Sequence, residues 1–186
     1  MPAAEPQRRL RDSRERSDEE LISLAREGDE QAFGALYRRH SQYVAGIVFR
    51  LIGGDADVDD VVQLTFIEAL RGLSGLQEAE SFRGWLYRLS VCQVNRRLKK
   101  RWRVGRLRAA LEWVVPQRAD LREGVAALEL RTLLDKLAPE DRIAWLLHHV
   151  QGETLPETAR LCETSLATVK RRIARADRAV GGETHV

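Results

Sequence analysis

Residues 152–176 read G-E-T-L-P-E-T-A-R-L-C-E-T-S-L-A-T-V-K-R-R-I-A-R-A. Thr154, followed three residues later by Glu157, forms a capping box, which predicts that a helix begins there. Ser165 predicts the start of a second helix, because serine is a favoured N-cap residue. Two short helices joined by a tight turn, the second of them basic, are typical of a helix-turn-helix that binds DNA.

The second of these helices has an apolar face and a basic face. Apolar residues recur at spacings of three and four, so we expect this face to be buried: Leu166, Val169, Ile173, Ala176 and Val180. A helix fits the major groove, where side chains of its first turn reach base edges and later Lys and Arg side chains bind phosphates. The residues that we expect to face DNA are Ser165, Thr168, Lys170, Arg171, Arg172 and Arg175. A solvated basic helix in an unrelated bundle is the alternative.

The turn between the two helices departs from the common pattern. Glu163 stands where glycine is frequent, and Thr164 follows where a branched aliphatic residue is usual. A left-handed backbone conformation at a residue other than glycine costs about 1 kcal/mol. We therefore expect a looser or slightly altered turn.

Helical periodicity also dominates the chain before this stretch, and strand alternation is nearly absent. Asp29 and Ser81 predict helix starts, and Gly53 predicts a helix end. We expect an all-α fold of two small helical domains joined by a flexible linker, with the helix-turn-helix in the second domain. The expected boundaries are a disordered N-terminal extension at residues 1–17, a first domain at 18–102, the linker at 103–124, a second domain at 125–181 and a tail at 182–186.

Charge is distributed unevenly along the 186 residues, although the formal net charge is only +3. Residues 55–80 hold seven acidic residues and one basic residue, whereas residues 81–108 hold ten basic residues and no acidic one. Asp57, Asp60 and Gln63 are spaced by three and share a helix face. We expect the acidic and the basic segments to face partners of opposite charge, although capping of a helix N-terminus explains part of the acidic cluster.

Composition disfavours several classes of protein. No stretch approaches the roughly 18 consecutive apolar residues of a membrane span, and the N-terminus lacks the apolar core of a signal peptide. We therefore expect a cytoplasmic protein without membrane insertion. Cys92 and Cys162 are far apart, and neither a metal-ligand spacing, a catalytic constellation nor a Gly-rich phosphate loop is found. We expect no metal, no cofactor and no enzymatic activity.

Taken in order, the motifs resemble the extracytoplasmic-function sigma factors of the sigma-70 family over roughly residues 20–180. L-I-S-L-A-R-E-G-D-E-Q-A-F-G-A-L-Y-R-R-H at 21–40 is similar to the opening helices of that family. D-A-D-V-D-D-V-V-Q-L-T-F-I-E-A-L at 55–70 resembles the segment that binds the coiled coil of the polymerase β′ subunit. S-F-R-G-W-L-Y-R-L-S at 81–90 resembles the segment that opens the promoter −10 element, and 152–176 resembles the domain that reads the −35 element.

The resemblance implies a subunit that binds core RNA polymerase, through the β′ coiled coil and the β flap, and directs promoter-specific initiation. The residues implied in core polymerase binding are Asp57, Asp60, Gln63 and Phe66, although Leu64 replaces a glutamate usual in the family. Aromatic side chains beside basic ones hold unstacked bases. The residues implied in binding the melted −10 strand are Phe82, Trp85, Arg88, Arg96, Arg97, Lys99 and Lys100. Promoter DNA and an anti-sigma factor are the further partners implied.

Two alternatives apply to these assignments. Phe82 and Trp85 can be core residues first. A helix-turn-helix regulator that never joins polymerase accounts for the end of the chain but leaves the acidic-then-basic segment unexplained. Co-purification with core polymerase separates the regulator from the sigma factor.

Overall fold

The structure, a computed structural model, describes residues 16–53, 55–76, 81–110 and 125–181. Within this part of the chain the fold is all-α and contains no strand, as predicted. The helices of the N-terminal module are α2 (Asp18–Arg26), α3 (Glu30–Ile52), α4 (Val58–Gly72) and α5 (Phe82–Ala110). Single 3₁₀ turns, η1 (Asp55–Asp57) and η2 (Leu73–Gly75), precede and follow α4.

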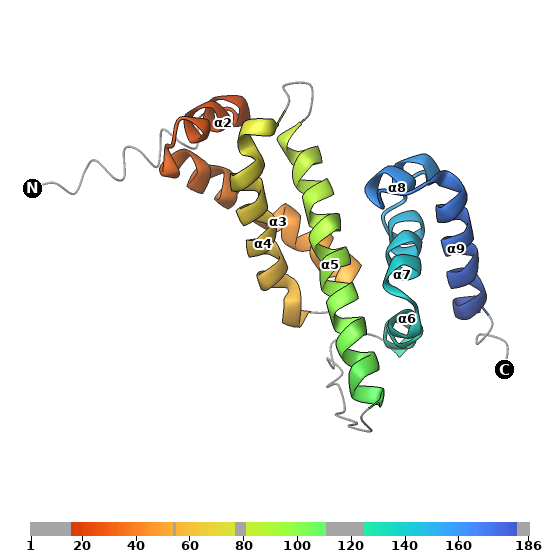
Figure 1. Cartoon of the computed structure of the whole chain (residues 1–186). Coiled ribbons are helices and arrows are strands. Elements are labelled where there is room, and N and C mark those ends of the chain that lie inside the picture. Colours follow the sequence, from red (N-terminus) through yellow and green to blue (C-terminus); the bar gives the residue numbers. More distant parts are fainter. Residues whose placement is uncertain (1–15, 54, 77–80, 111–124, 182–186) are drawn as a thin grey trace, which may run out of the picture.

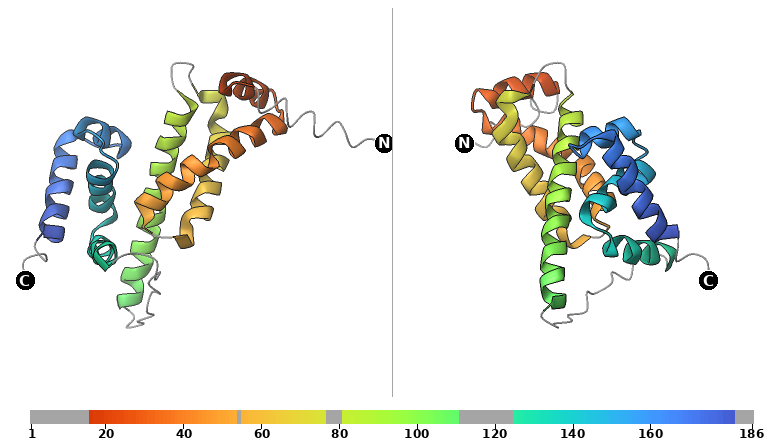
Figure 2. Two further views of the ribbon diagram at one scale, coloured as in Figure 1. Left: turned by 180° about the vertical axis from the view of Figure 1, so that it is seen from behind. Right: turned by 45° about the vertical axis from the view of Figure 1, so that its right-hand side comes forward.

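The C-terminal module lies against the opposite side of α5 from α4 (Figures 1 and 2). Its elements are α6 (Val125–Lys136), α7 (Pro139–Trp145), the π turn η3 (Leu146–Val150), α8 (Leu155–Leu161) and α9 (Leu166–Gly181). Pro139 occupies the first turn of α7, where its missing N–H costs no helical hydrogen bond. The two-module architecture predicted from the sequence is therefore present.

Helix ends follow the predicted capping residues. The Asp29 carboxylate accepts hydrogen bonds from the backbone N–H groups of Gln31 and Ala32, and Gly53 ends α3 in the left-handed conformation. Ser81 Oγ accepts from the N–H of Gly84 at 3.0 Å. These local interactions set where α3 and α5 begin, which is why capping patterns predict the boundaries well.

Two expected boundaries are wrong. Ser17, placed in the disordered extension, is the N-cap of α2, since its hydroxyl and the Glu20 carboxylate each accept from the other's backbone N–H. The segment 103–110, placed in the linker, continues α5 to Ala110. Weak amphipathic periodicity there reflects a helix that is exposed from residue 103 to 107, where no stripe of apolar residues is required. Residues 1–15, 111–124 and 182–186 lie outside the described part of the chain.

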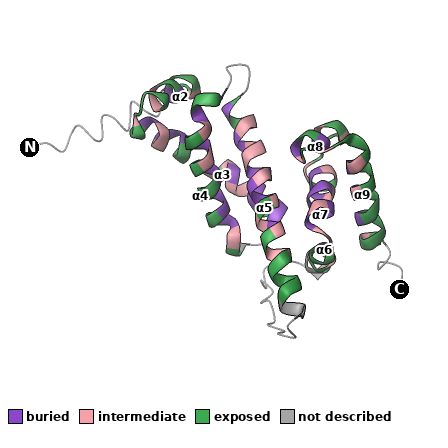
Figure 3. Cartoon of the chain, viewed as in Figure 1, coloured by how far each residue is buried: buried purple, intermediate pink, exposed green. Residues whose placement is uncertain are grey.

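The buried side chains form a core that crosses from one module to the other. Helices α3, α4 and α5 turn their buried faces toward one another (Figure 3). The same buried cluster extends to the C-terminal module through Leu134, Ile143, Leu146, Leu147 and Leu161. A second, smaller cluster inside that module holds α9 against α7 and α8 through Ala144, Ala159, Val169 and Ile173.

Candidate functional site

The helix-turn-helix predicted at the end of the chain is formed by α8 and α9. Thr154 Oγ1 accepts from the Glu157 N–H, and Ser165 Oγ accepts from the Thr168 N–H, so both predicted N-caps are confirmed. The Glu157 carboxylate is turned toward Arg160, with contacts of 2.9 and 2.5 Å. Glu163 adopts φ of 50°, so the turn keeps the left-handed conformation in spite of the missing glycine.

Helix α9 presents its basic side chains to solvent while its apolar face packs on α7 and α8. Val169, Ile173 and Ala176 are buried as predicted. Leu166 was expected to join them but is 41% exposed, because the cluster that covers α9 begins one turn later, at Val169. The first turn of α9 is therefore more exposed to solvent than the apolar periodicity predicts.

The six residues predicted to face DNA differ in their local contacts. Lys170 and Arg171 are exposed, and Arg171 donates to Thr168 Oγ1 at 3.2 Å, which links it to the Ser165 hydroxyl. Arg172 is half-buried. Arg175 binds the buried Asp141 carboxylate of α7 through two hydrogen bonds of 2.8 and 2.5 Å. Its charge is therefore partly neutralised, which leaves Lys170 and Arg171 as the more accessible cations.

Helix α4 has an outer face that combines an acidic residue with apolar side chains. The Asp60 side chain is 68% exposed, and Gln63 is exposed beside it. Leu64, Ile67 and Leu70 are 46%, 44% and 53% exposed. We call these five residues the α4 face. Its apolar part was missed from the sequence, although the spacing of three from Leu64 through Ile67 to Leu70 beside polar neighbours was the available signal.

Phe66 does not belong to this face, contrary to prediction. It is 3% exposed, and its ring lies 4.7 Å from that of Tyr37 and 6.4 Å from that of Phe33, between ring centroids. The residue falls on the same side of α4 as Val62 and Ala69, which are also buried. Its aromatic side chain therefore fills the core and cannot contact a partner in this structure.

The acidic and basic segments partly pair with each other, and the expectation that each also faces a partner of opposite charge stays a prediction. Packing of α4 against α5 brings Asp57 to Arg97 in a short ion pair, and places Arg101 3.5 Å away. Arg97 also lies 3.8 Å from Asp60. The hydrogen bond from Arg97 is the largest cause that holds the pKa of Asp57 below its ordinary value. Asp57 and Arg97 thus join two helices of one module.

We expect Asp57→Asn to lower the free energy of unfolding by about 1–2 kcal/mol at pH 7, because it removes a charge-assisted hydrogen bond that is partly screened by solvent. The folded-state pKa of Asp57 is lowered, so its contribution is complete above the ordinary pKa of 3.8 and is lost as the pH falls through the lowered value. Denaturant unfolding of both proteins between pH 2 and pH 7 measures this. A difference that grows on acidification would contradict the assigned ion pair.

The start of α5 buries one of its two predicted base-binding rings. Phe82 is 4% exposed and lies edge-on to His40, with ring centroids 5.3 Å apart, so it is a core residue in this structure, as the alternative expected. Trp85 is half-buried and packs so closely on Gly72 that a Cβ added there would lie 3.1 Å from the indole. Of the pair, Trp85 alone keeps part of its surface accessible.

Residues 73–76, which follow α4, are held from the side of α2 by Arg26, which was not predicted from the sequence. Arg26 donates to the backbone carbonyls of Leu73 and Leu76, at 3.1 and 2.5 Å. On α5 itself, the Arg83 guanidinium lies 3.9 Å above the centre of the Tyr43 ring. These contacts fix both flanks of the segment 77–80, which lies outside the described residues.

The cations along α5 fall into two groups. Arg96 and Lys100 are exposed and, four residues apart, share one helix face. Arg88 and Lys99 are half-buried on the side of the C-terminal module, where Lys99 Nζ lies 3.2 Å from a Glu140 carboxylate oxygen. Of the predicted strand-binding cations, Arg96 and Lys100 are therefore the more accessible to a DNA phosphate.

In the part of the chain that the structure describes, no group of three or more His, Cys, Asp or Glu side chains could hold a metal ion. None of the helices in that part of the chain combines the length and apolar character of a membrane span.

The chain matches the models of a known protein family. The family models Sigma-70 region 2 and Sigma-70 region 4 match residues 36–104 and 127–179. The chain is 31% identical to the ECF RNA polymerase sigma factor SigM of Mycobacterium tuberculosis, over 87% of this chain and 82% of that relative. The chain belongs to the extracytoplasmic-function sigma factors. It is also 31% identical to the ECF RNA polymerase sigma-E factor of Escherichia coli K12, over 90% of this chain and 94% of that protein.

Two solved structures share the fold of this chain. CnrH, in complex with the cytosolic domain of CnrY, superposes with a TM-score of 0.55 at 30% identity, covering 90% of this chain and 96% of CnrH. RpoE of Bartonella quintana, in complex with the anti-sigma factor NepR, has a TM-score of 0.58 at 18% identity, covering 83% and 97%, and shows the shared fold. The family resemblance seen in the motifs is confirmed, and a sigma factor is favoured over a regulator that binds DNA alone.

Proposed function

We propose that this sigma factor binds core RNA polymerase through the α4 face, and that it holds the two promoter elements with α5 and α9. The observation that carries this proposal is the α4 face itself. The opposite side of α4 is buried in the core, so the exposed Leu64, Ile67 and Leu70 contribute nothing to that core. Exposed apolar patches with a polar rim are typical of protein-binding sites. A regulator that binds only DNA is not expected to have such a patch on α4.

The α4 face suits a basic helical partner with an apolar seam. Leu64, Ile67 and Leu70 would bury apolar area, and the exposed Asp60 would pair with an Arg or Lys at the edge of that contact. Replacement of the family's usual glutamate by Leu64 makes this contact more apolar. We infer that the β′ coiled coil of polymerase is the partner, as the resemblance of residues 55–70 to the family's β′-binding segment implies.

The two DNA-binding surfaces act on different forms of the promoter. Arg96 and Lys100 on α5 would follow the phosphates of the melted −10 strand, with Trp85 available to a base. Helix α9 would enter the major groove of the −35 element, with Ser165 and Thr168 in its first turn near base edges. Tethering both surfaces in one chain raises the effective concentration of the second contact once the first has formed.

An anti-sigma factor is a further proposed partner. CnrH was solved in complex with the cytosolic domain of CnrY, and the sigma factor RpoE of Bartonella quintana was solved in complex with the anti-sigma factor NepR. A protein that covered the α4 face would compete with polymerase for the same apolar side chains.

The proposal is tested by mixing the purified chain with core RNA polymerase and measuring whether the two elute together in size-exclusion chromatography. We expect a stable complex that forms without DNA. A chain that binds promoter fragments but never co-elutes with core polymerase would be a regulator, and the α4 face would then need another partner.

We expect Lys170→Ala combined with Arg171→Ala to weaken binding to −35 duplex DNA roughly tenfold and to reduce the slope of log affinity against log salt by about two. Each cation that contacts a phosphate releases about one counterion, and both side chains are exposed on α9. Fluorescence anisotropy over a salt series gives the slope. The matched control, Arg38→Ala with Arg50→Ala on α3, should leave it unchanged; an equal change in both double variants would show that α9 has no special role.

A further inference from the structure

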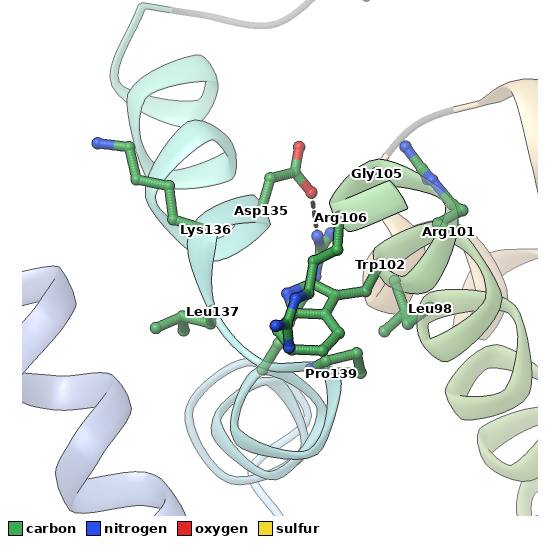
Figure 4. A pocket seen from close by; sticks show the side chains of 10 residues that line it. Leu98, Arg101, Trp102, Gly105, Arg106, Asp135, Lys136, Leu137 and Pro139 are labelled. Atoms are coloured by element: carbon green, nitrogen blue, oxygen red, sulfur yellow. Dashed lines mark hydrogen bonds and ion pairs between the residues drawn. The ribbon is translucent and has the colours of Figure 1, made fainter. Parts of the chain in front are cut away.

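We propose that the chain binds a small anionic ligand with a flat ring, of the nucleoside phosphate class, in a pocket between α5, α6 and α7. The pocket has a volume of about 340 Å³ (Figure 4). Ligand sites in proteins begin at about 300 Å³, so this volume suits a molecule of the size of a mononucleotide. The polymerase and promoter contacts proposed above do not involve this pocket.

The wall that α5 contributes is one face of that helix. Leu98, Trp102 and Gly105 line the pocket and recur at spacings of four and three, so they lie on one side of α5. Arg96 and Lys100, which are expected to follow the melted strand, lie on another side of the helix and do not line the pocket. The pocket is therefore separate from the proposed strand-binding surface.

Positive charge dominates the lining of the pocket. Among the described residues that line it, the charged ones are Arg101, Arg106, Lys136, Arg142 and Asp135. Asp135 pairs with Arg142, and Arg101 lies 3.5 Å from Asp57, whereas Arg106 and Lys136 are exposed. An excess of cations around a concave site attracts an anion. A phosphate group carries up to about two negative charges, so it suits this site better than a carboxylate, which carries one.

Arg142 supplies a donor that the described protein groups do not use. Its side chain is 6% exposed, and its Nη1 and Nη2 donate to Asp135 and to the Ile52 carbonyl. Its Nε has no hydrogen-bond partner among the described residues. Buried polar groups nearly always have a partner, so this N–H at the wall of the pocket suits an acceptor oxygen of the ligand. Burial is the largest cause that lowers the pKa of Arg142, and the positive charge of Arg101 adds to it, an effect that a bound anion would counter.

Trp102 offers a flat surface to the ring of the ligand. The Arg106 guanidinium lies 4.8 Å from the centre of the Trp102 ring, and both groups line the pocket (Figure 4). Nucleic-acid bases stack on aromatic rings and on guanidinium planes, so this pair provides both a stacking surface and a charge for the phosphate. Leu98, Leu137 and Pro139 supply the apolar part of the lining. Apolar walls with a few convergent polar groups are typical of small-molecule sites.

Gly105 leaves space on the side of α5. The residue lies inside the helix, where glycine is less favourable than alanine. A Cβ added to it would meet nothing within 4 Å among the described residues, so packing of those residues does not require a glycine here. A longer side chain at this position would occupy part of the pocket, which makes Gly105 a direct site for a blocking substitution.

Binding is measured by isothermal titration calorimetry of the full chain with four probes, namely AMP, GMP, adenosine and inorganic phosphate. We expect AMP or GMP to bind at one site with a dissociation constant below about 1 mM. Because the ring and the anion contact different parts of the lining, adenosine and inorganic phosphate should each bind at least about tenfold more weakly. The proposal is overturned if neither nucleotide binds, or if one of the two fragments binds as tightly as the nucleotides.

Gly105→Leu is the blocking variant. Leucine is a better helix former than glycine, so we expect this variant to resist denaturant at least as well as wild type. Its affinity for the nucleotide should nevertheless fall about tenfold or more. Trp102→Ala should weaken nucleotide binding about tenfold through the loss of stacking, and Arg106→Gln about three- to tenfold. These two variants carry the test if Gly105→Leu fails to fold.

Arg103→Gln is the matched control for Arg106→Gln. Arg103 is exposed on the same helix, its Nε donates to the Lys99 carbonyl at 3.3 Å, and it does not line the pocket. We expect its nucleotide affinity to stay within about twofold of wild type. An equal loss in Arg103→Gln, or an unchanged affinity in a folded Gly105→Leu protein, would overturn the proposal.

A labelled pool of random single-stranded DNA distinguishes a mononucleotide site from a strand site. We expect Gly105→Leu and Trp102→Ala to bind this pool as wild type does, because Arg96 and Lys100 are unchanged in both variants. Retained −35 duplex binding verifies that each variant is folded. Parallel loss of strand and nucleotide affinity would show that the pocket belongs to the strand-binding surface, and would overturn the proposal of a separate ligand site.

Discussion

Asp60→Arg is expected to weaken association with core RNA polymerase about 30-fold or more, while the fold is retained. Close charge pairs across a protein interface have coupling energies of about 1.5–7 kcal/mol, and charge reversal adds repulsion against a basic partner. The Asp60 side chain is 68% exposed, and its carboxylate lies 3.8 Å from the Arg97 guanidinium, a long distance for an ion pair. The change should therefore act on docking far more than on stability. Titration of labelled chain with core polymerase measures the affinity.

The control for this prediction is Asp59→Arg, the same substitution at an exposed neighbour on α4 that lies outside the α4 face. It alters the net charge equally, so any general electrostatic effect on association appears in both variants. We expect Asp59→Arg to bind within about threefold of wild type, as a charge at the rim contributes little. Equal loss in both variants would mean that overall charge, and not the α4 face, determines binding.

Phe66→Ala is expected to lower the free energy of unfolding by about 3–5 kcal/mol, because it leaves a cavity in the core of the N-terminal module. The ring is 3% exposed and packs against Phe33 and Tyr37. Chemical denaturation followed by circular dichroism measures the loss. Leu64→Ala, on the opposite side of the same helix and 46% exposed, should change stability by less than about 0.5 kcal/mol.

The same pair of variants distinguishes core from docking residues. We expect Leu64→Ala to reduce polymerase binding and Phe66→Ala, where it is folded, to retain it. A Phe66→Ala protein of wild-type stability that no longer bound polymerase would place the ring at the interface and would contradict its position in the core.

Local interactions made much of the fold predictable from sequence. Caps at Asp29, Ser81 and Ser165 depend on a side chain and a backbone N–H only a few residues away, and all three are confirmed. The position of the turn at Glu163 was likewise predictable, although its left-handed conformation was expected to be altered by the missing glycine. Such features are encoded within one or two turns of chain.

Contacts between helices explain what the sequence did not reveal. Phe66 is apolar and lies on the core side of α4, yet family motifs alone assigned it to a partner. Asp57 was predicted as a docking residue, and its pairing with Arg97, 40 positions later, was not predicted. That pair forms only when α4 packs against α5. The Arg142 contact with the Ile52 carbonyl spans 90 positions and leaves no periodic signal in the sequence.

Run-off transcription with core RNA polymerase on genomic DNA fragments tests the central claim most directly. We predict discrete transcripts that depend on the wild-type chain, that are lost with Asp60→Arg and that persist with Asp59→Arg. If core polymerase gives the same transcripts with and without the chain, while the chain itself still binds DNA, then it does not act as a sigma factor through α4.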